Sequence, residues 1–160
     1  MVEEKFLRIK KLYEQYTNEK FSMSDHENRL TLQKIICAVE CNGSKNFDYS
    51  FGWYLRGPYS PTLASDGYHV DAKGTEMELE LEKNEEKIAD ELKRDIKFLN
   101  GLRQVMGDEK NLELYSSILF LKIMEKRSEE NIFNTIKTTK PWYDEEIVKK
   151  AIKDINSLLV

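Results

Sequence analysis

Ser60, Asp66 and His69 are the residue types of a nucleophile, an acid and a base, and they stand within ten positions of one another. Such a set hydrolyses esters or amides when the histidine reaches the serine hydroxyl and the aspartate orients the histidine. However, the serine lacks the Gly-x-Ser-x-Gly surroundings of a nucleophile elbow. Pro61 follows it, and a Ser-Pro pair is typical of the start of a helix. The sequence therefore favours a helix-capping role for Ser60 over catalysis.

Two cysteines and two histidines are the candidates for a metal site. Cys37 and Cys41 are four residues apart, so a helix would place both thiols on one face. A zinc ion would need two further ligands, and the chain offers His26 and His69 without zinc-type spacing. Free cysteines usually pack as small apolar side chains. We therefore expect two buried thiols and no metal or other cofactor.

An alternating segment and a later aromatic pair are the candidates for binding a partner. Residues 47–55 alternate large apolar side chains with mostly smaller or polar ones, which predicts a β-strand with one aromatic face. We expect that face to pack in the core and Tyr54 and Arg56 to point outward; stacking of nucleic-acid bases is the alternative. Trp142 and Tyr143 either form an exposed spot for a partner or pack against the last helix.

The segments that carry these residues are mostly helical. Apolar residues recur at helical spacing in residues 3–16, 28–42, 60–70, 84–106 and 111–126, after Ser128, and from Asp144 onward. Residues 75–83 alternate at a period of two, which predicts a second strand, although they also fit a helix that begins with a capping box. The fold class is therefore mainly α (α+β), with a small two-stranded antiparallel ribbon, in a single domain of residues 1–160.

The distribution of charge bears on the choice of partner. The chain has a formal net charge of −4, and residues 71–95 alone hold ten acidic and five basic side chains. A protein that binds nucleic acid normally presents a basic face, so this distribution disfavours a DNA partner. The apolar runs are too short to span a bilayer, and the N-terminus lacks the order of a secretory signal. We expect a cytoplasmic protein with no membrane partner.

A fairly specific motif runs from the predicted helix at residues 28–42 into the predicted helix at residues 60–70. It consists of a Leu-Gln-Lys helix, an alternating strand, a Gly-Pro-Tyr-Ser corner, and a Leu and an Asp spaced three residues apart. In this chain these residues are Leu32, Gln33, Lys34, Gly57, Pro58, Tyr59, Ser60, Leu63 and Asp66. With them, residues 28–155 resemble the uncharacterised YwgA-like proteins of bacteria and archaea. The stretches "LELYSSILFL" and "TTKPWYDEEIVKKA" are also similar to that family, whereas Gly67 stands where it usually has a large apolar residue.

A more distant similarity, to Panacea-type antitoxin domains, implies a winged-helix-like helical domain that works through protein partners. We therefore expect a non-catalytic cytosolic module for regulation or protein interaction, whose partner is another protein or a second copy of itself. A wide apolar band at residues 84–106, which includes Phe98, is the basis for a second copy.

Two other functions remain as alternatives. The first is a winged-helix DNA-binding transcriptional regulator that reads DNA with the helix at residues 60–70. The second is a small hydrolase or nuclease. The residues expected in the motif or in an interaction are Tyr54, Arg56, Gly57, Pro58, Tyr59, Ser60, Asp66 and Trp142. The Gly-Pro-Tyr-Ser corner among them is expected to be mainly structural.

Overall fold

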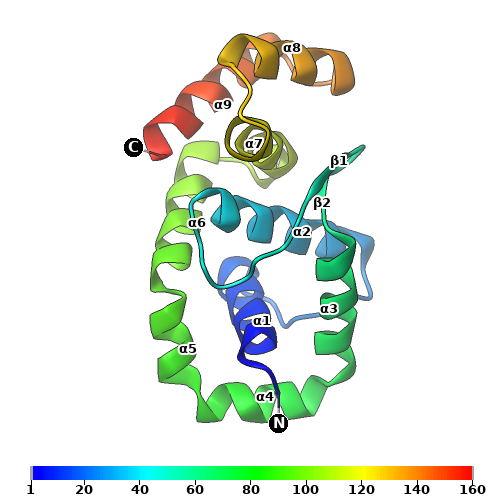
Figure 1. Ribbon diagram of the computed structural model, residues 1–160, viewed down its shortest axis with the longest axis vertical. Helices are drawn as coiled ribbons and strands as arrows, with labels where there is room; N and C mark the ends of the chain where they lie inside the picture. The colour runs from blue at the N-terminus through cyan, green and yellow to red at the C-terminus, as the bar shows by residue number, and fades with distance from the viewer. Residues whose placement is uncertain (1, 160) are drawn as a thin grey trace.

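A computed structural model describes residues 2–159 and shows a mainly helical chain with one small ribbon of two antiparallel strands (Figure 1). This confirms the predicted fold class. In chain order the elements are α1 (Glu4–Thr17), α2 (His26–Cys41), β1 (Gly52–Tyr54), β2 (Gly57–Tyr59), α3 (Pro61–Ala72), α4 (Gly74–Lys83), α5 (Glu85–Glu91), α6 (Lys93–Met106), a 3₁₀ turn (Glu109–Asn111), α7 (Leu112–Leu119), a π-helical turn (Phe120–Met124), α8 (Glu129–Thr139) and α9 (Glu145–Leu158).

The helices form a frame around α1 and α2. In Figure 1, α3 runs down one side, α4 crosses the bottom, and α5 and α6 rise on the other side. This U-shaped run encloses α1, which packs against α3, α4, α5 and α6. Helix α2 crosses above α1, and α7 with α8 and α9 lies above α2. The ribbon precedes α3 and adjoins its N-terminal end, which is the end nearest to α7.

Helix α2 is the central helix, as its apolar residues predict. Leu32, Ile36 and Val39 lie on one side of this helix and are fully buried. Cys37 lies on the opposite side and is fully buried as well. The helix packs against α3, α6, α7 and β2, so it has neighbours in nearly every direction. Cys37 and Cys41 are buried free thiols, as expected, and burial raises the pKa of the Cys37 thiol well above its usual value.

The ribbon lies at a different place from the predicted one. Strand β1 pairs antiparallel with β2, so that Trp53 faces Pro58 across a two-residue turn. Residues 47–51 are irregular rather than part of a strand, since Asp48 has a φ of +62° and the Tyr49 N–H donates to a side chain, Glu40 Oε1, at 2.6 Å. The alternation nevertheless reflects burial, because Phe47 and Tyr49 both lie in the core.

Residues 75–83, predicted as the second strand, belong to helix α4 instead. Met77 and Leu81 are buried one helical turn apart, while Leu79 between them is exposed. Glutamate, leucine, methionine and lysine are all good helix formers, so local propensity agrees with this outcome. The alternation at a period of two was therefore misleading. The acidic side chains of this segment lie on a helix and not on a wing of the ribbon.

The predicted helix at 84–106 consists of α5 and α6, with a bend at Leu92, where ψ is 0°. Its apolar band faces the inside of the frame, and Ile88, Leu92, Leu99 and Leu102 are buried there. Phe98 is buried with them. Within residues 84–106, all of which the structure describes, no large apolar side chain is exposed. The basis for a second copy at this band is therefore weaker than the sequence indicates, and the dimer stays a prediction.

Gly67 allows α3 to approach the segment that precedes α2. A Cβ atom at this position would lie 2.7 Å from Met23 Cε and 3.1 Å from Leu32 Cδ2. Real Cβ atoms do not tolerate the first of these distances, so a larger residue would require the flexible end of the Met23 side chain to move. The close packing explains why a glycine fits here, where the YwgA-like pattern has a larger residue.

We predict that two helix-capping serines differ in their contribution to stability. The Leu63 N–H donates to Ser60 Oγ, and the Asn131 N–H donates to Ser128 Oγ, both at 3.2 Å. Ser60 is fully buried, whereas Ser128 is exposed. Because water can reach only the second N–H, Ser60→Ala should lower the free energy of unfolding by about 2 kcal/mol and Ser128→Ala by about 0.5 kcal/mol. Urea unfolding measures both, and a Ser60→Ala protein as stable as its parent would contradict the capping role.

Candidate functional site

The carboxylate of Glu113, in the first turn of α7, is surrounded by three cationic side chains. Its side chain is 9% exposed. Lys140 Nζ donates to Oε2 at 3.0 Å, Arg56 Nε donates to Oε1 at 3.2 Å, and Lys34 Nζ lies 3.9 Å from Oε1. The N-terminal end of a helix also favours a negative charge. Glu113 therefore joins α2, the turn of the ribbon, α7 and the connection between α8 and α9.

Lys140 is the most deeply buried of these cations, with 1% of its surface exposed. Its Nζ also donates to the carbonyl oxygen of Leu55 at 2.8 Å, and it lies 5.2 Å from the ring centroid of Trp53 and 5.7 Å from that of Trp142. A buried ammonium group is tolerated when it is both paired and hydrogen-bonded, and these contacts supply both conditions. Lys140 therefore fixes the tip of the ribbon relative to Trp142.

Gly57 adopts a backbone conformation that favours glycine, beside α7. Its φ is +106°. A Cβ atom at this position would stand 3.6 Å from both Glu113 Cγ and Ser117 Oγ, and 3.9 Å from Lys34 Cε, which are ordinary van der Waals contacts. The φ of the turn, and not the space beside Glu113, therefore favours glycine here.

Lys34 differs from the other two cations because it has no close partner. Its side chain is 9% exposed, yet its nearest carboxylate oxygen, on Glu113, is 3.9 Å away, beyond hydrogen-bond distance. Among residues 2–159 no acceptor forms a hydrogen bond with its Nζ. Burial is the main cause that lowers the pKa of Lys34, and the negative charge of Glu113 opposes this effect.

Lys34 and Glu113 lie at the bottom of an open hollow of about 590 Å³. Arg56, Lys110 and Trp142 are exposed residues that line the same hollow. A second hollow, between α1 and α4, is also rich in charge, but its cations are already paired: Lys10 with Glu14 at 2.6 Å, Lys20 with Glu78 at 2.5 Å and Lys11 with Glu85 at 3.7 Å. The hollow above Lys34 is therefore the better candidate for a binding site.

Beside the hollow lies a surface that we call the tip patch, formed by Tyr54, Leu55, Arg56 and Trp142. Tyr54 is 50% exposed, Leu55 75% and Trp142 60%, which is unusual for large apolar side chains. The bond of Lys140 to Leu55 and its proximity to the Trp142 ring hold the two parts of the patch together. Trp142 is therefore exposed, which is one of the two arrangements that the sequence allowed; packing against the last helix was the other.

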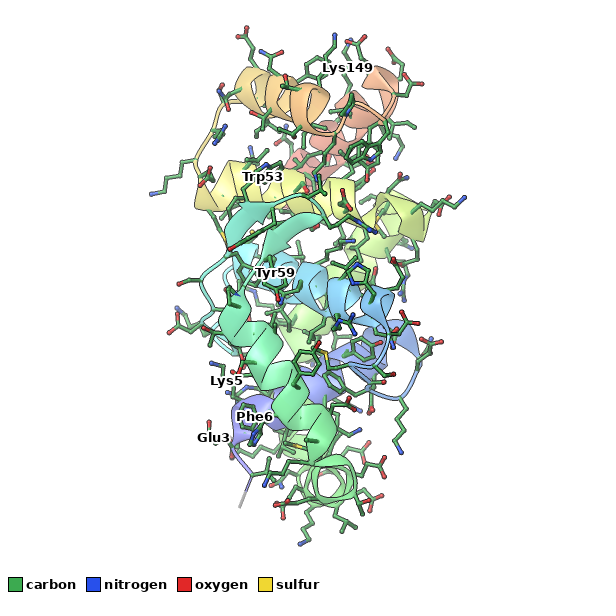
Figure 2. The ribbon with its side chains drawn as sticks, turned by 90° about the vertical axis from the view of Figure 1, so that its right-hand side faces the viewer. Glu3, Lys5, Phe6, Trp53, Tyr59 and Lys149 are labelled. Atoms are coloured by element: carbon green, nitrogen blue, oxygen red, sulfur yellow. The ribbon has the colours of Figure 1, made fainter. Side chains whose placement is uncertain are left out.

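The ribbon supports the tip patch from behind. Trp53 stacks on Phe120, with ring centroids 6.1 Å apart, and Tyr59 contacts Tyr54 edge to face at 5.2 Å. Figure 2 shows Trp53 on the side of the ribbon next to α7 and Tyr59 on the side towards α3. Pro58 lies inside β2, where it pairs with Trp53.

The structure thus separates the predicted site residues into three sets. Tyr54, Arg56 and Trp142 belong to the tip patch, in which Arg56 and Trp142 line the same hollow and Tyr54 contacts Tyr59. Gly57, Pro58, Tyr59 and Ser60 support it, and Gln33 binds both backbone groups of Ser60, with its Oε1 accepting the N–H at 2.8 Å and its Nε2 donating to the carbonyl at 2.9 Å. Asp66 lies elsewhere and accepts the hydroxyl of Tyr49 at 2.5 Å.

Sequence reasoning missed Glu113 and Lys140 as members of the site and noted Lys34 only as part of a motif. One signal was present: Glu113 stands between two leucines in an otherwise apolar stretch, and a charged residue at such a position needs a partner. Its partners are distant in the sequence, so the pattern alone does not identify them.

The nucleophile, acid and base considered first do not come together. Ser60 Oγ is buried and accepts the Leu63 N–H, Asp66 is bound to Tyr49, and the ring of His69 packs against Phe6 at 4.7 Å. In the part of the chain that the structure describes, no three His, Cys, Asp or Glu side chains are grouped so that they could hold a metal ion. None of the helices in that part combines the length and apolar character that crossing a membrane requires.

Comparisons of the chain with protein-family models, with curated proteins and with solved structures found no match. The YwgA-like resemblance, the winged-helix arrangement and the function inferred from them therefore stay predictions.

We predict that Glu113 contributes more to stability than any single cation around it. Glu113→Gln leaves Lys34 and Lys140 buried without a neutralising charge, and should lower the free energy of unfolding by about 3–5 kcal/mol. Lys140→Met should cost less, because Arg56 and Lys34 still face the carboxylate. Glu125→Gln, at an exposed ion pair with Arg127, serves as the surface control and should change little. Denaturant unfolding at neutral pH gives this order, and a larger loss for Lys140→Met than for Glu113→Gln would contradict it.

Proposed function

We propose that the protein is a non-catalytic cytoplasmic module for regulation through protein interaction, and that it binds another protein with the tip patch. The observation that carries this proposal is that Trp142 and Arg56 are exposed around one hollow, while Leu55 and Tyr54 are exposed at the adjoining end of the ribbon. Tryptophan, tyrosine and arginine are the residue types that most often dominate binding energy at protein interfaces. Large aromatic and aliphatic side chains exposed together on one surface indicate a binding site rather than a chance feature.

The rigidity of the tip patch supports the same function. Trp142 and Leu55 come from segments about 90 residues apart, and both are held by the buried ammonium group of Lys140. A surface that is already ordered loses less conformational entropy when a partner binds. The patch is therefore suited to recognition without rearrangement.

Charge favours a protein over DNA as the partner. Helix α3, the reader helix of the alternative function, contains no lysine or arginine and carries Asp66 and Asp71. Helix α4 follows it directly and adds Glu76, Glu78, Glu80 and Glu82 at the end of the frame. Phosphate groups would be repelled from this side of the molecule. Protein binding is thus better supported than the reading of DNA by α3.

We predict that a photo-crosslinking amino acid at position 55 will capture one protein in cells that make this chain. The control is the same amino acid at position 79 in α4, where Leu79 is also exposed, at 53% against 75% for Leu55, and where α4 lies at the opposite end of the molecule. The expected result is one reproducible adduct from position 55, absent from position 79 and lost when Trp142→Ala is added.

Four outcomes would contradict the proposal. Equal adducts from positions 55 and 79, or an adduct that Trp142→Ala leaves unchanged, would show that the tip patch is not the binding surface. An adduct of twice the mass of one chain would identify a second copy instead of another protein. Firm retention on heparin at low salt, with loss of retention as salt rises, would favour DNA.

A further inference from the structure

Lys34 is a buried cation whose ammonium group still reaches solvent. Its side chain is 91% buried, because the exposed fraction is 9%. The side chain lines the hollow beside the tip patch, and its Nζ is not among the fully enclosed polar atoms of the described residues. An ammonium group that is mostly removed from water and has no acceptor in the protein retains part of its desolvation cost. An acceptor that entered the hollow would relieve this cost.

The charges around Lys34 indicate the charge of the missing acceptor. Lys34, Arg56 and Lys140 face the carboxylate of Glu113, and Glu27 Oε1 lies 3.5 Å from an Nη atom of Arg56. Three cations therefore stand against two carboxylates, which leaves one positive charge. At the rim, Glu109 is paired with Arg103 at 3.0 Å, and Lys110 is exposed to solvent, which screens its charge. A single negative charge would balance the site, and a carboxylate carries that charge.

The place of this positive charge suggests where the carboxylate comes from. Lys34 lies at the bottom of the hollow, Arg56 belongs to both the hollow and the tip patch, and Trp142 lines the hollow from the other side. A chain bound on the tip patch would therefore pass over the opening. The hollow, at about 590 Å³, has room for an acidic side chain.

We propose that Lys34 and Arg56 form a subsite for one side-chain carboxylate of the partner protein. The carboxylate oxygen accepts a hydrogen bond from Lys34 Nζ, and the guanidinium of Arg56 faces it from the rim. This inference rests on the proposed function, because the carboxylate belongs to the protein that the tip patch binds. It gives the partner a chemical character: an acidic residue next to the residues that contact Trp142.

The test uses acetate as the probe and the whole, unmodified protein. Lysine labelled with ¹³C at Cε allows each ammonium-bearing carbon to be followed by NMR while acetate replaces chloride at constant ionic strength. The Lys34 signal should shift and saturate. Lys10 is the internal control, since its side chain is similarly buried but already paired with Glu14 at 2.6 Å, so its signal should not move.

Variants then identify the residue that is responsible. Lys34→Met keeps the length of the side chain and removes the charge; acetate binding, followed by the indole N–H signal of Trp142, should become about tenfold weaker or more. Lys110→Met removes a cation from the rim of the same hollow and should leave acetate binding unchanged. If Lys34→Met does not fold, the titration of the unmodified protein still decides.

Two results would overturn the subsite. In the first, the Lys34 signal moves no more than that of Lys10. In the second, inorganic phosphate produces a larger and tighter shift than acetate, which would make the site one for a dianion. The acetate titration needs no partner, so it is independent of crosslinking at position 55. Saturable acetate binding without an adduct would contradict the proposed function and the protein source of the carboxylate, whereas an adduct without acetate binding would contradict the subsite alone.

Discussion

The pairing of one buried carboxylate with three cations determines how the upper part of the molecule is arranged. Lys140 contacts one carboxylate oxygen of Glu113, and Arg56 contacts the other. Lys34 Nζ lies 3.9 Å from the oxygen that Arg56 contacts. Removing one member of a buried ion pair leaves an uncompensated charge in a region of low dielectric constant. These residues come from α2, α7, the ribbon turn and the α8–α9 connection, so these elements must stay together. This constraint is stronger than the apolar contacts of the ribbon alone, since β1 and β2 have three residues each and a two-stranded hairpin is marginal by itself.

The consequence for function is a division of the molecule into two ends. At one end α3, α4 and α5 wrap around α1, and the exposed side chains of α4 are mainly acidic. At the other end the ion cluster holds an exposed tryptophan and leucine in fixed positions, with a hollow that leads to Lys34. The electrostatic requirement that orders the cluster also leaves one cation incompletely paired. The same residues thus provide the rigidity of the surface and its affinity for a negative charge.

The sequence predicted the features that depend on neighbouring residues. Ser60 followed by Pro61 gave the start of α3, and the apolar residues on every side of α2 gave its central position. The prediction failed at residues 75–83, because Met77, Leu79 and Leu81 fit a strand as well as a helix, and the choice depends on whether a partner strand exists. It also failed to assemble the site. Glu113 lies 57 residues from Arg56, 79 from Lys34 and 27 from Lys140, and no periodic pattern connects such positions.

The central claim is that Glu113 and its cations unite the ribbon, α7 and the α8–α9 connection into one structural unit. Native-state hydrogen exchange at low denaturant concentration tests it most directly, because it measures the free energy at which each backbone N–H opens. The account predicts that the amides of β1 and β2, the Tyr143 N–H that donates to the Lys140 carbonyl, and the amides of α7 open together with one free energy. Opening of the ribbon at a much lower free energy, while α7 and Tyr143 stay protected, would contradict it.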